Sequence, residues 1–155
     1  MNKPFYFKEF TIDQDKTAMK VGTDGVLLGA WCSLENFPKT ILDIGTGTGI
    51  ISLMLAQRSS AISIDGVEID KSAFEQTGDN YENSDWSDRL CCHNASFQKF
   101  ADESNNQGVK YDLIVSNPPF YKEDYITSNI SRNQARFTQF LTFKELIQGV
   151  SQILS

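Results

Sequence analysis

The chain has 155 residues, of which 40% are hydrophobic and 22% are charged, and its formal net charge is −6. These values are typical of one soluble globular domain with a buried core, and they exclude a disordered or fibrous chain. The apolar runs are far shorter than the roughly 20 residues of a membrane span, and no apolar segment follows the first residues. We therefore expect a cytoplasmic protein with no membrane partner.

The number and spacing of the cysteines also favour a cytoplasmic protein. The three cysteines, Cys32, Cys91 and Cys92, are odd in number and show no Cys-x-x-Cys spacing, and His93 is the only histidine of the chain. This pattern predicts reduced thiols and argues against a structural zinc site, so no metal is expected.

The negative charge is unevenly distributed along the chain. Residues 41–112 hold twelve acidic and five basic residues, whereas residues 1–40 and 113–155 together carry a small positive excess. Acidity weakens the case for a nucleic-acid partner, but the flanking segments leave it open.

The first forty residues are expected to form an arm and a short helix. Residues 5–12 are rich in aromatic residues that favour strands, and a polar turn follows, so residues 5–21 are interpreted as a small hairpin or arm. Thr23 or Asp24 is expected to cap an apolar helix that reaches Trp31. The first amides of that helix would suit an anionic or carboxylate group, and a helix that only packs is the alternative.

From residue 40 onward, strand and helix patterns alternate. Such alternation predicts an α/β fold with a doubly wound, mostly parallel sheet, in which sites form at the carboxyl ends of the strands. Gly45, Glu68, Asn94 and Asn117 all fall at those ends. The expected strands are residues 41–44, 62–67, 90–93 and 112–116, and the expected helices are residues 50–58 and 71–82, with a helical turn at 97–103.

A glycine-rich loop follows the first of these strands. Glycines at 45, 47 and 49 allow a tight turn and a close approach to a ligand, and Asp43 lies just below the loop. Glu68 is placed to accept hydrogen bonds from both hydroxyls of a ribose, so a nucleotide-type cofactor is expected. The Gly-x-Gly-x-Gly spacing after an acid favours S-adenosylmethionine over a dinucleotide, because S-adenosylmethionine carries an ammonium and no phosphate.

The last expected strand ends in Asn117, Pro118, Pro119 and Phe120. If the Asn117 side-chain oxygen and the Pro118 carbonyl oxygen accept the two hydrogens of an exocyclic amine, the lone pair of that amine is freed for attack on an electrophile. The prolines fix the backbone that presents these acceptors, and the Phe120 ring offers a face on which a base can stack. The alternative is an ordinary turn between a strand and a helix.

These motifs, in this order and spacing, resemble the class I S-adenosylmethionine-dependent amino-methyltransferases, which have a Rossmann-like fold. The stretch from Met19 to Trp31 narrows the resemblance to the adenine-N6 methyltransferases of bacterial valine tRNA, which act on the adenine 3′ of the anticodon. The resemblance implies an enzyme that methylates N6 of adenine in tRNA. Protein glutamine, guanine N2 of ribosomal RNA and DNA adenine remain open as substrates, as does a fragment that binds cofactor or RNA without turnover.

The resemblance also implies roles for individual residues. Asp43, Gly45 and Gly47 would contact the methionine part of the cofactor, Glu68 the ribose, and residues 94–97 the cofactor adenine. Residues 20–24 would lie over the cofactor and help to close the site. Such enzymes usually place an aspartate against that adenine, and here Asn94 would accept the same hydrogen bond through its amide oxygen. Residues 117–120 would hold the target base and act as the catalytic residues. The implied cofactor-binding residues are Lys20, Thr23, Asp24, Asp43, Gly45, Thr46, Gly47, Glu68, Ile69, Asn94, Ala95 and Ser96.

Basic residues beyond this loop are candidates for contacts with tRNA phosphates. Arg132 and Arg136 lie one helical turn apart, and Lys122 precedes them. Lysines of the arm would add to this set, although a solvated helix face explains the same pattern.

The last segment predicts a helix that needs a partner surface. Thr142 and Glu145 form a capping box, and an apolar stripe follows. The stripe comprises Leu146, Ile147, Val150, Ile153 and Leu154. Members of the family that this chain resembles continue from this helix into further strands of the sheet. We therefore expect an incomplete sheet and a fragment of a longer protein. Residues 1–39 are expected to form the arm and capped helix over the cofactor site, and residues 40–155 the incomplete domain that binds S-adenosylmethionine.

Overall fold

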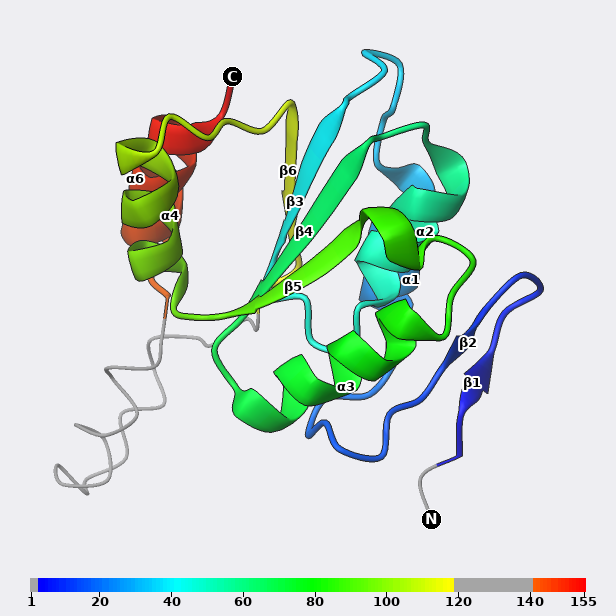
Figure 1. Cartoon of the computed structure of the whole chain (residues 1–155). Helices are drawn as coiled ribbons and strands as arrows, with labels where there is room; N and C mark the ends of the chain where they lie inside the picture. The colour runs from blue at the N-terminus through cyan, green and yellow to red at the C-terminus, as the bar shows by residue number, and fades with distance from the viewer. Residues whose placement is uncertain (1–2, 119–140) are drawn as a thin grey trace, which may run out of the picture.

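A computed structural model describes residues 3–118 and 141–155 of the chain. Four parallel strands form one sheet in the order β5-β4-β3-β6, and helices cover both of its faces (Figure 1). The expected α/β fold with a parallel, doubly wound sheet is therefore confirmed. The strands are β3 (Thr40–Ile44), β4 (Ser63–Glu68), β5 (Leu90–Asn94) and β6 (Leu113–Ser116).

The inner strand β3 is buried on both sides. Ile41 belongs to the apolar cluster on one face of the sheet, and Leu42 belongs to the cluster on the other. Because successive side chains of a strand point to opposite faces, a continuous apolar run is what a doubly covered strand requires.

The helices are divided between the two faces. Figure 1 shows α1, α2 and α3 on one face, and α4 and α6 side by side on the other. These helices are α1 (Thr23–Trp31), α2 (Ile50–Arg58), α3 (Lys71–Glu82), α4 (Phe97–Asn106) and α6 (Phe143–Ile153), and a short 3-10 helix, η1 (Ser87–Arg89), precedes β5.

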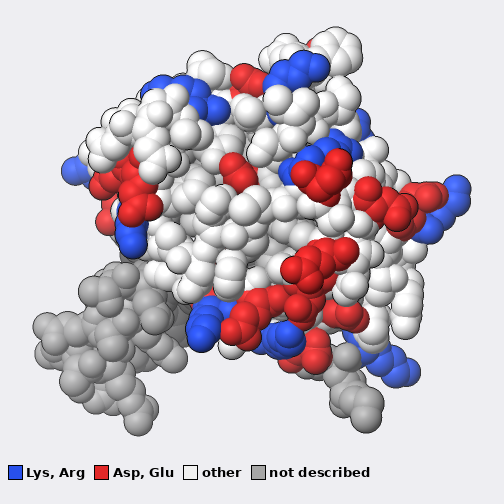
Figure 2. All heavy atoms as spheres, viewed as in Figure 1, with Lys and Arg blue, Asp and Glu red and all other residues white. Residues whose placement is uncertain are grey.

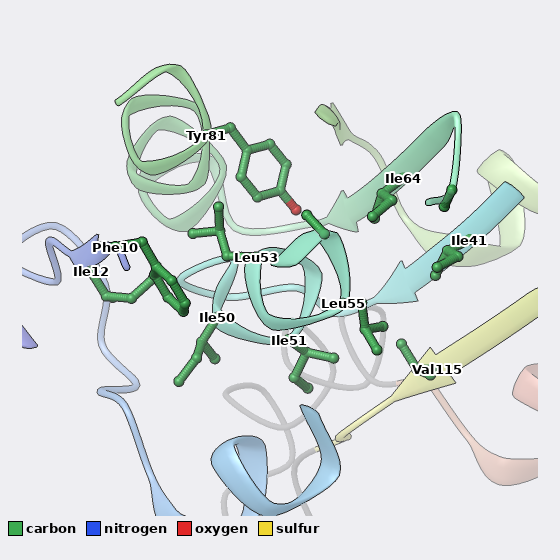
Figure 3. Packing of buried hydrophobic residues seen from close by; sticks show 12 residues of the cluster. Phe10, Ile12, Ile41, Ile50, Ile51, Leu53, Leu55, Ile64, Tyr81 and Val115 are labelled. Carbon is green, nitrogen blue, oxygen red and sulfur yellow. The ribbon is translucent and has the colours of Figure 1, made fainter. Parts of the chain in front are cut away.

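Helix α2 lies at the centre of the larger apolar cluster. Figure 3 shows it with the strand residues Ile41, Ile64 and Val115 on one side and the hairpin residues Phe10 and Ile12 on the other. All five side chains are less than 10% exposed. Burial of such a side chain stabilises the fold by about 1.5 to 3 kcal/mol, so this packing holds the start of α2, and the loop before it, in place.

The amino-terminal residues form the expected small hairpin. Strand β1 (Phe5–Tyr6) pairs antiparallel with β2 (Thr11–Ile12). The chain after β2 is attached to α3 by backbone amides. The Asp13 amide donates to Asn80 Oδ1 at 2.9 Å, and the Lys16 amide donates to Gln76 Oε1 at 2.8 Å.

The carboxyl-terminal helix α6 packs on α4. Its predicted capping box is present, with Thr142 and Glu145 bonded to each other's backbone amides. The predicted stripe packs on α4 through part of its length, because Ile153 is fully buried whereas Ile147 is 67% and Leu154 is 46% exposed. The contact with α4 is made by the face that carries the small residue Gly149, and Ile147 points away from that face.

Two predicted helix boundaries are corrected by the structure. The N-cap of α1 is Gly22, which has no side chain to cap the helix, and Thr23 and Asp24 already lie in the first turn, so neither is the capping residue. From that position, the negative charge of Asp24 still interacts favourably with the positive end of the helix dipole. Ser96 caps the start of helix α4, and the helix continues to Asn106 instead of ending at residue 103, because its buried face extends to Ala101 and Ser104.

Strand β6 has one strand partner, β3, among the described residues. Near its start, Tyr111 forms an isolated parallel bridge with Leu154, in which the Tyr111 amide donates to the Ile153 carbonyl at 2.8 Å. The expected further strands remain a prediction. Within residues 3–118 and 141–155, no helix is long and apolar enough to cross a membrane.

The contact between α4 and α6 predicts an unfavourable glycine substitution. A Cβ at Gly149 would lie 2.5 Å from Phe97 Cε1 and 3.3 Å from Ala101 Cβ. We expect Gly149→Ala to lower the free energy of unfolding by about 1 to 3 kcal/mol in urea denaturation followed by circular dichroism. The matched control is Gly78→Ala in α3, where nothing lies within 4 Å of the added Cβ. It should raise stability by about 0.5 to 1 kcal/mol. Equal effects of the two substitutions would contradict the prediction.

Candidate functional site

The carboxyl ends of the four strands meet at one edge of the sheet. The parallel register pairs Ile44 with Val67 on one side and with Ser116 on the other. The residues that end or follow the strands therefore gather at this edge, where sites of such sheets form. They are Gly45, Glu68, Asn94 and Asn117.

The loop between β3 and α2 depends on backbone conformations that favour glycine. Gly45, Gly47 and Gly49 have φ values of 70°, 61° and 81°. At Gly49 a Cβ would also lie 2.7 Å from Tyr81 Cε1, so both conformation and space require glycine there.

Asp43 lies beneath this loop and is fully buried. Its Oδ2 accepts hydrogen bonds from Thr46 Oγ1 and Ser52 Oγ, each at 2.8 Å. Its Oδ1 is the one buried side-chain nitrogen or oxygen atom without a hydrogen-bond partner in the described part of the chain. Burial raises the pKa of Asp43 from 3.8 to about 6, and the hydrogen bonds from Thr46 and Ser52 oppose that rise.

Helix α3 holds the glycine loop through buried polar side chains. Thr77 Oγ1 donates to the Gly47 carbonyl at 2.7 Å, and Asn80 Nδ2 donates to the Thr48 carbonyl at 2.8 Å. Tyr81 reaches the same loop, with its hydroxyl 3.2 Å from Thr46 Oγ1. Sequence reasoning missed these positioning residues. The available signal was their spacing, since positions 77, 80 and 81 share one face of a helix.

The Glu68 carboxylate accepts hydrogen bonds from the backbone of two loops, one after β3 and one after β4. Its Oε2 accepts from the Gly47 amide at 3.0 Å, and its Oε1 accepts from the Asp70 amide at 2.9 Å. Each carboxylate oxygen has a second lone pair, so the pair can still accept from two hydroxyls of a ligand. Ile69, the next residue, is 46% exposed and offers an apolar surface beside them.

Asn94 ends β5 with a defined amide orientation. Its Nδ2 donates to the carbonyls of Glu68 at 2.9 Å and Ile69 at 3.3 Å. Because both partners are acceptors, the amide nitrogen must face them, which leaves Oδ1 available as an acceptor. Ala95 donates its amide to the Glu68 carbonyl, and the Ser96 hydroxyl is used as the N-cap of α4.

Asn117 and Pro118 follow β6 beside the glycine loop. The Ser116 hydroxyl donates to the Ile44 carbonyl at 2.9 Å, which ties the end of β6 to β3. A Cβ at Gly25 would lie 3.9 Å from Asn117 Nδ2, so the first turns of α1 lie against Asn117. Pro119 and Phe120 lie outside the described residues.

Of the cofactor-binding residues predicted in the amino-terminal segment, only some lie near this edge of the sheet. Thr23 and Asp24 are exposed in the first turn of α1, the helix that contacts Asn117. The ammonium of Lys20 instead donates to the carbonyls of Gln14 and Thr17, within the arm.

The basic residues predicted to contact phosphate lie mostly outside the described part of the chain. Lys122, Arg132 and Arg136 all belong to residues 119–140. Of the arm lysines, Lys16 forms an ion pair with Asp79 on α3. On the face seen in Figure 2, acidic and basic side chains are mixed over α3 and do not form a continuous basic surface.

The arrangement suits a ligand with three kinds of polar group. The buried negative charge of Asp43 favours a cationic group near the loop, the Glu68 carboxylate can accept from neighbouring hydroxyls, and the Asn94 oxygen can accept from an amine. At the end of β6, the Asn117 side chain can take a second amine-bearing group.

Comparison with known sequences identifies similar proteins over nearly the whole chain. A family model described as "Methyltransferase small domain" matches residues 23–138. The tRNA1(Val) (adenine(37)-N6)-methyltransferase of Christiangramia forsetii is 62% identical over 154 residues, which cover 99% of this chain and 64% of that protein. The protein of the same name from Bacteroides fragilis is 47% identical over 156 residues, again covering 64% of its length. The chain thus spans less than two thirds of these relatives.

Solved structures show the same fold at low sequence identity. The SAM-dependent methyltransferase from Agrobacterium tumefaciens superposes with a TM-score of 0.61 at 21% identity, over 75% of this chain and 39% of that one. The O-methyltransferase from Bacillus cereus in complex with SAH gives 0.52 at 20% identity, over 64% and 46% of the two chains. The expected Rossmann-like class I methyltransferase fold is therefore confirmed.

Burial of Asp43 predicts a pH dependence of stability. Because its pKa is about 6 in the folded chain and 3.8 is the ordinary value, the folded chain binds more protons between these values. The free energy of unfolding should therefore fall as the pH rises from about 4 to about 6, by about 3 kcal/mol in total. Asp43→Asn should remove this fall, measured by urea denaturation at pH values of about 4, 5 and 7. The control Asp102→Asn, at an exposed position of α4, should keep it. An unchanged slope in Asp43→Asn would contradict the assignment.

Proposed function

The chain belongs to the methyltransferase small-domain family, and on that premise we propose that it binds S-adenosylmethionine and transfers the methyl group to N6 of adenine in tRNA. The observation that carries the proposal is the adjacency of two loops. The register of Ile44 with Ser116 puts Asn117 next to the glycine loop, where a base amine would meet a bound cofactor. The proposal includes the division into a segment 1–39 over the cofactor site and a cofactor-binding domain 40–155.

The residues at the strand ends fit the cofactor. Asp43 is fully buried below the loop that would receive the methionine part, so its negative charge would favour the cofactor ammonium from beneath the loop. Glu68 would hold the two ribose hydroxyls through its free lone pairs. Asn94 would accept from the adenine amine through Oδ1, in place of the aspartate that the resembled family usually has.

The remaining implied contacts are part of the same proposal. Gly45, Gly47 and Thr46 would bind through the loop backbone, and Thr46 also bonds to Asp43. Ile69, Ala95 and Ser96 would line the adenine. Thr23 and Asp24 would approach from α1, whereas Lys20 would have to leave its carbonyl partners in the arm.

Methyl transfer would then depend on how the chain presents the target amine. S-adenosylmethionine would supply an electrophilic methyl group. The Asn117 side-chain oxygen and the Pro118 carbonyl would accept the two amine hydrogens, which concentrates the lone pair on nitrogen for direct attack. Pro119 and Phe120 would complete this loop, the latter as a stacking surface for an adenine that has left its base stack.

The choice of tRNA as substrate rests on the relatives and not on a basic surface. The two relatives described above carry names for methylation of adenine 37 in tRNA1(Val), and the similarity to them extends over at least 99% of this chain. Lys122, Arg132 and Arg136 are the proposed phosphate contacts. With tRNA as the substrate, the proposed compartment is the cytoplasm.

One alternative is favoured by a specific observation. Because the chain spans 64% of the length of these relatives, it could bind the cofactor without turning it over. Cofactor binding and methyl transfer must therefore be measured separately.

Cofactor binding is tested by calorimetric titration with S-adenosylhomocysteine. We expect Glu68→Gln to weaken binding about 10- to 100-fold, because a charged acceptor of two hydroxyl hydrogen bonds is lost. The matched control is Glu82→Gln, an exposed acid at the end of α3, which should bind like the wild type. Wild-type affinity should also fall below a pH of about 6, as Asp43 becomes protonated. Unchanged binding by Glu68→Gln would contradict the proposed ribose contact.

Catalysis is tested by methyl transfer to four unmodified substrates assayed in parallel. These are valine tRNA, ribosomal RNA, DNA and a glutamine-containing peptide. We expect N6-methyladenine in the tRNA alone, and a rate about 10²- to 10³-fold lower for Asn117→Ala with little change in S-adenosylhomocysteine affinity. Methylation of another substrate would replace tRNA in the proposal. Cofactor binding without any product would leave this chain as a binding fragment and overturn its assignment as an enzyme.

A further inference from the structure

Three potential metal ligands from two strands lie together on one side of the sheet. Asp65 of β4 and Cys91 and His93 of β5 each offer one ligand atom, and these atoms all lie within 4.8 Å of one another. Among residues 3–118 and 141–155, no other cluster of three or more histidine, cysteine or acidic side chains with this spacing is found.

Strand pairing creates this cluster. Asp65 is the register partner of Cys91, so their side chains are neighbours across the two strands. His93 lies two residues beyond Cys91 and therefore points to the same face. The counting of cysteines along the sequence could not reveal the site, because one ligand comes from the other strand.

Two further residues orient the ligands. The Tyr111 hydroxyl donates to Asp65 Oδ2 at 2.6 Å, which leaves Oδ1 facing His93 Nε2 at 3.3 Å. The His93 ring lies 5.1 Å from the Phe100 ring of α4, centroid to centroid, so its plane is held by packing. A hydrogen bond to the far oxygen of a carboxylate and a packed imidazole are typical supports of a metal site.

We propose that Asp65, Cys91 and His93 bind a zinc ion through one oxygen, one sulfur and one nitrogen atom. This mixed set suits zinc, whereas magnesium and calcium prefer oxygen ligands alone. Ligand atoms on one tetrahedral zinc ion lie about 3.5 Å apart, so small side-chain rotations would close the observed separations. Three protein ligands leave a fourth position for water or another ligand.

The site is open to solvent and lies next to the proposed cofactor edge. Cys91 is exposed, and the side chains of His93 and Asp65 are 39% and 17% exposed, so an ion can reach all three. His93 immediately precedes Asn94, which bonds to the end of β4. A bound ion would therefore link β5, at the edge of the described sheet, to β4 close to Asn94. This proposal does not depend on methyl transfer.

The test is titration of the reduced, untagged 155-residue chain with zinc, followed by calorimetry, and with cobalt, followed by absorption. We expect one ion per chain and a thiolate-to-cobalt charge-transfer band in the near ultraviolet. Cys91→Ser should abolish the band, and His93→Ala should greatly weaken zinc binding. Cys32→Ser is the matched control and should leave both signals unchanged. Tyr111→Phe keeps the ring and removes the supporting hydroxyl, so it should weaken zinc binding about tenfold or more.

A second measurement on the wild type avoids any dependence on the folding of the variants. Zinc should protect Cys91 from alkylation by iodoacetamide, detected by peptide mass spectrometry, with Cys32 as the internal reference. The absence of zinc binding by the folded chain would overturn the proposal. So would binding that survives in Cys91→Ser, or equal protection of both cysteines, and the cluster would then be only an ion pair between His93 and Asp65 with a neighbouring thiol.

Discussion

The pairing of β3 with β4 on one side and β6 on the other is the constraint on which the candidate site depends. Each of these strands contributes one functional residue or loop at its carboxyl end, and the parallel register brings those ends to one edge. A shift of β4 or β6 by one residue would turn its side chains to the opposite face of the sheet and move its end by about 3.3 Å, which would separate Glu68 or Asn117 from the glycine loop.

The same edge carries an energetic cost that the rest of the fold offsets. Asp43 is fully buried with one unpaired oxygen, beneath three glycines with positive φ. A buried acid with an unfilled acceptor destabilises the folded chain unless a ligand or a proton satisfies it. The apolar cluster around α2 and the polar contacts of α3 keep the loop in this conformation. Such preorganisation reduces the ordering that binding would otherwise require.

Strand β5 carries residues of both proposed sites. At its end, Asn94 uses its amide nitrogen on the carbonyls of Glu68 and Ile69, which leaves its amide oxygen available for the proposed cofactor. Its preceding residues, Cys91 and His93, face α4 together with Asp65 of β4. Because alternate residues of a strand point to opposite faces, one short edge strand can support two different chemistries without the sites sharing a side chain.

Much of the architecture was predictable from the sequence alone, because it depends on local periodicity and on backbone requirements. Alternating strand and helix patterns predicted the parallel sheet correctly, and the glycine spacing and strand-end acids predicted the edge at which cofactor binding is proposed. The sequence could not show that α3 braces the glycine loop through Thr77 and Asn80, that Gly22 and not Thr23 caps α1, or that Ile147 faces solvent. Nor could it bring Asp65 next to Cys91 and His93. Those features depend on contacts between residues distant along the chain, and only the packing of the elements and the register of the strands decides which of them meet.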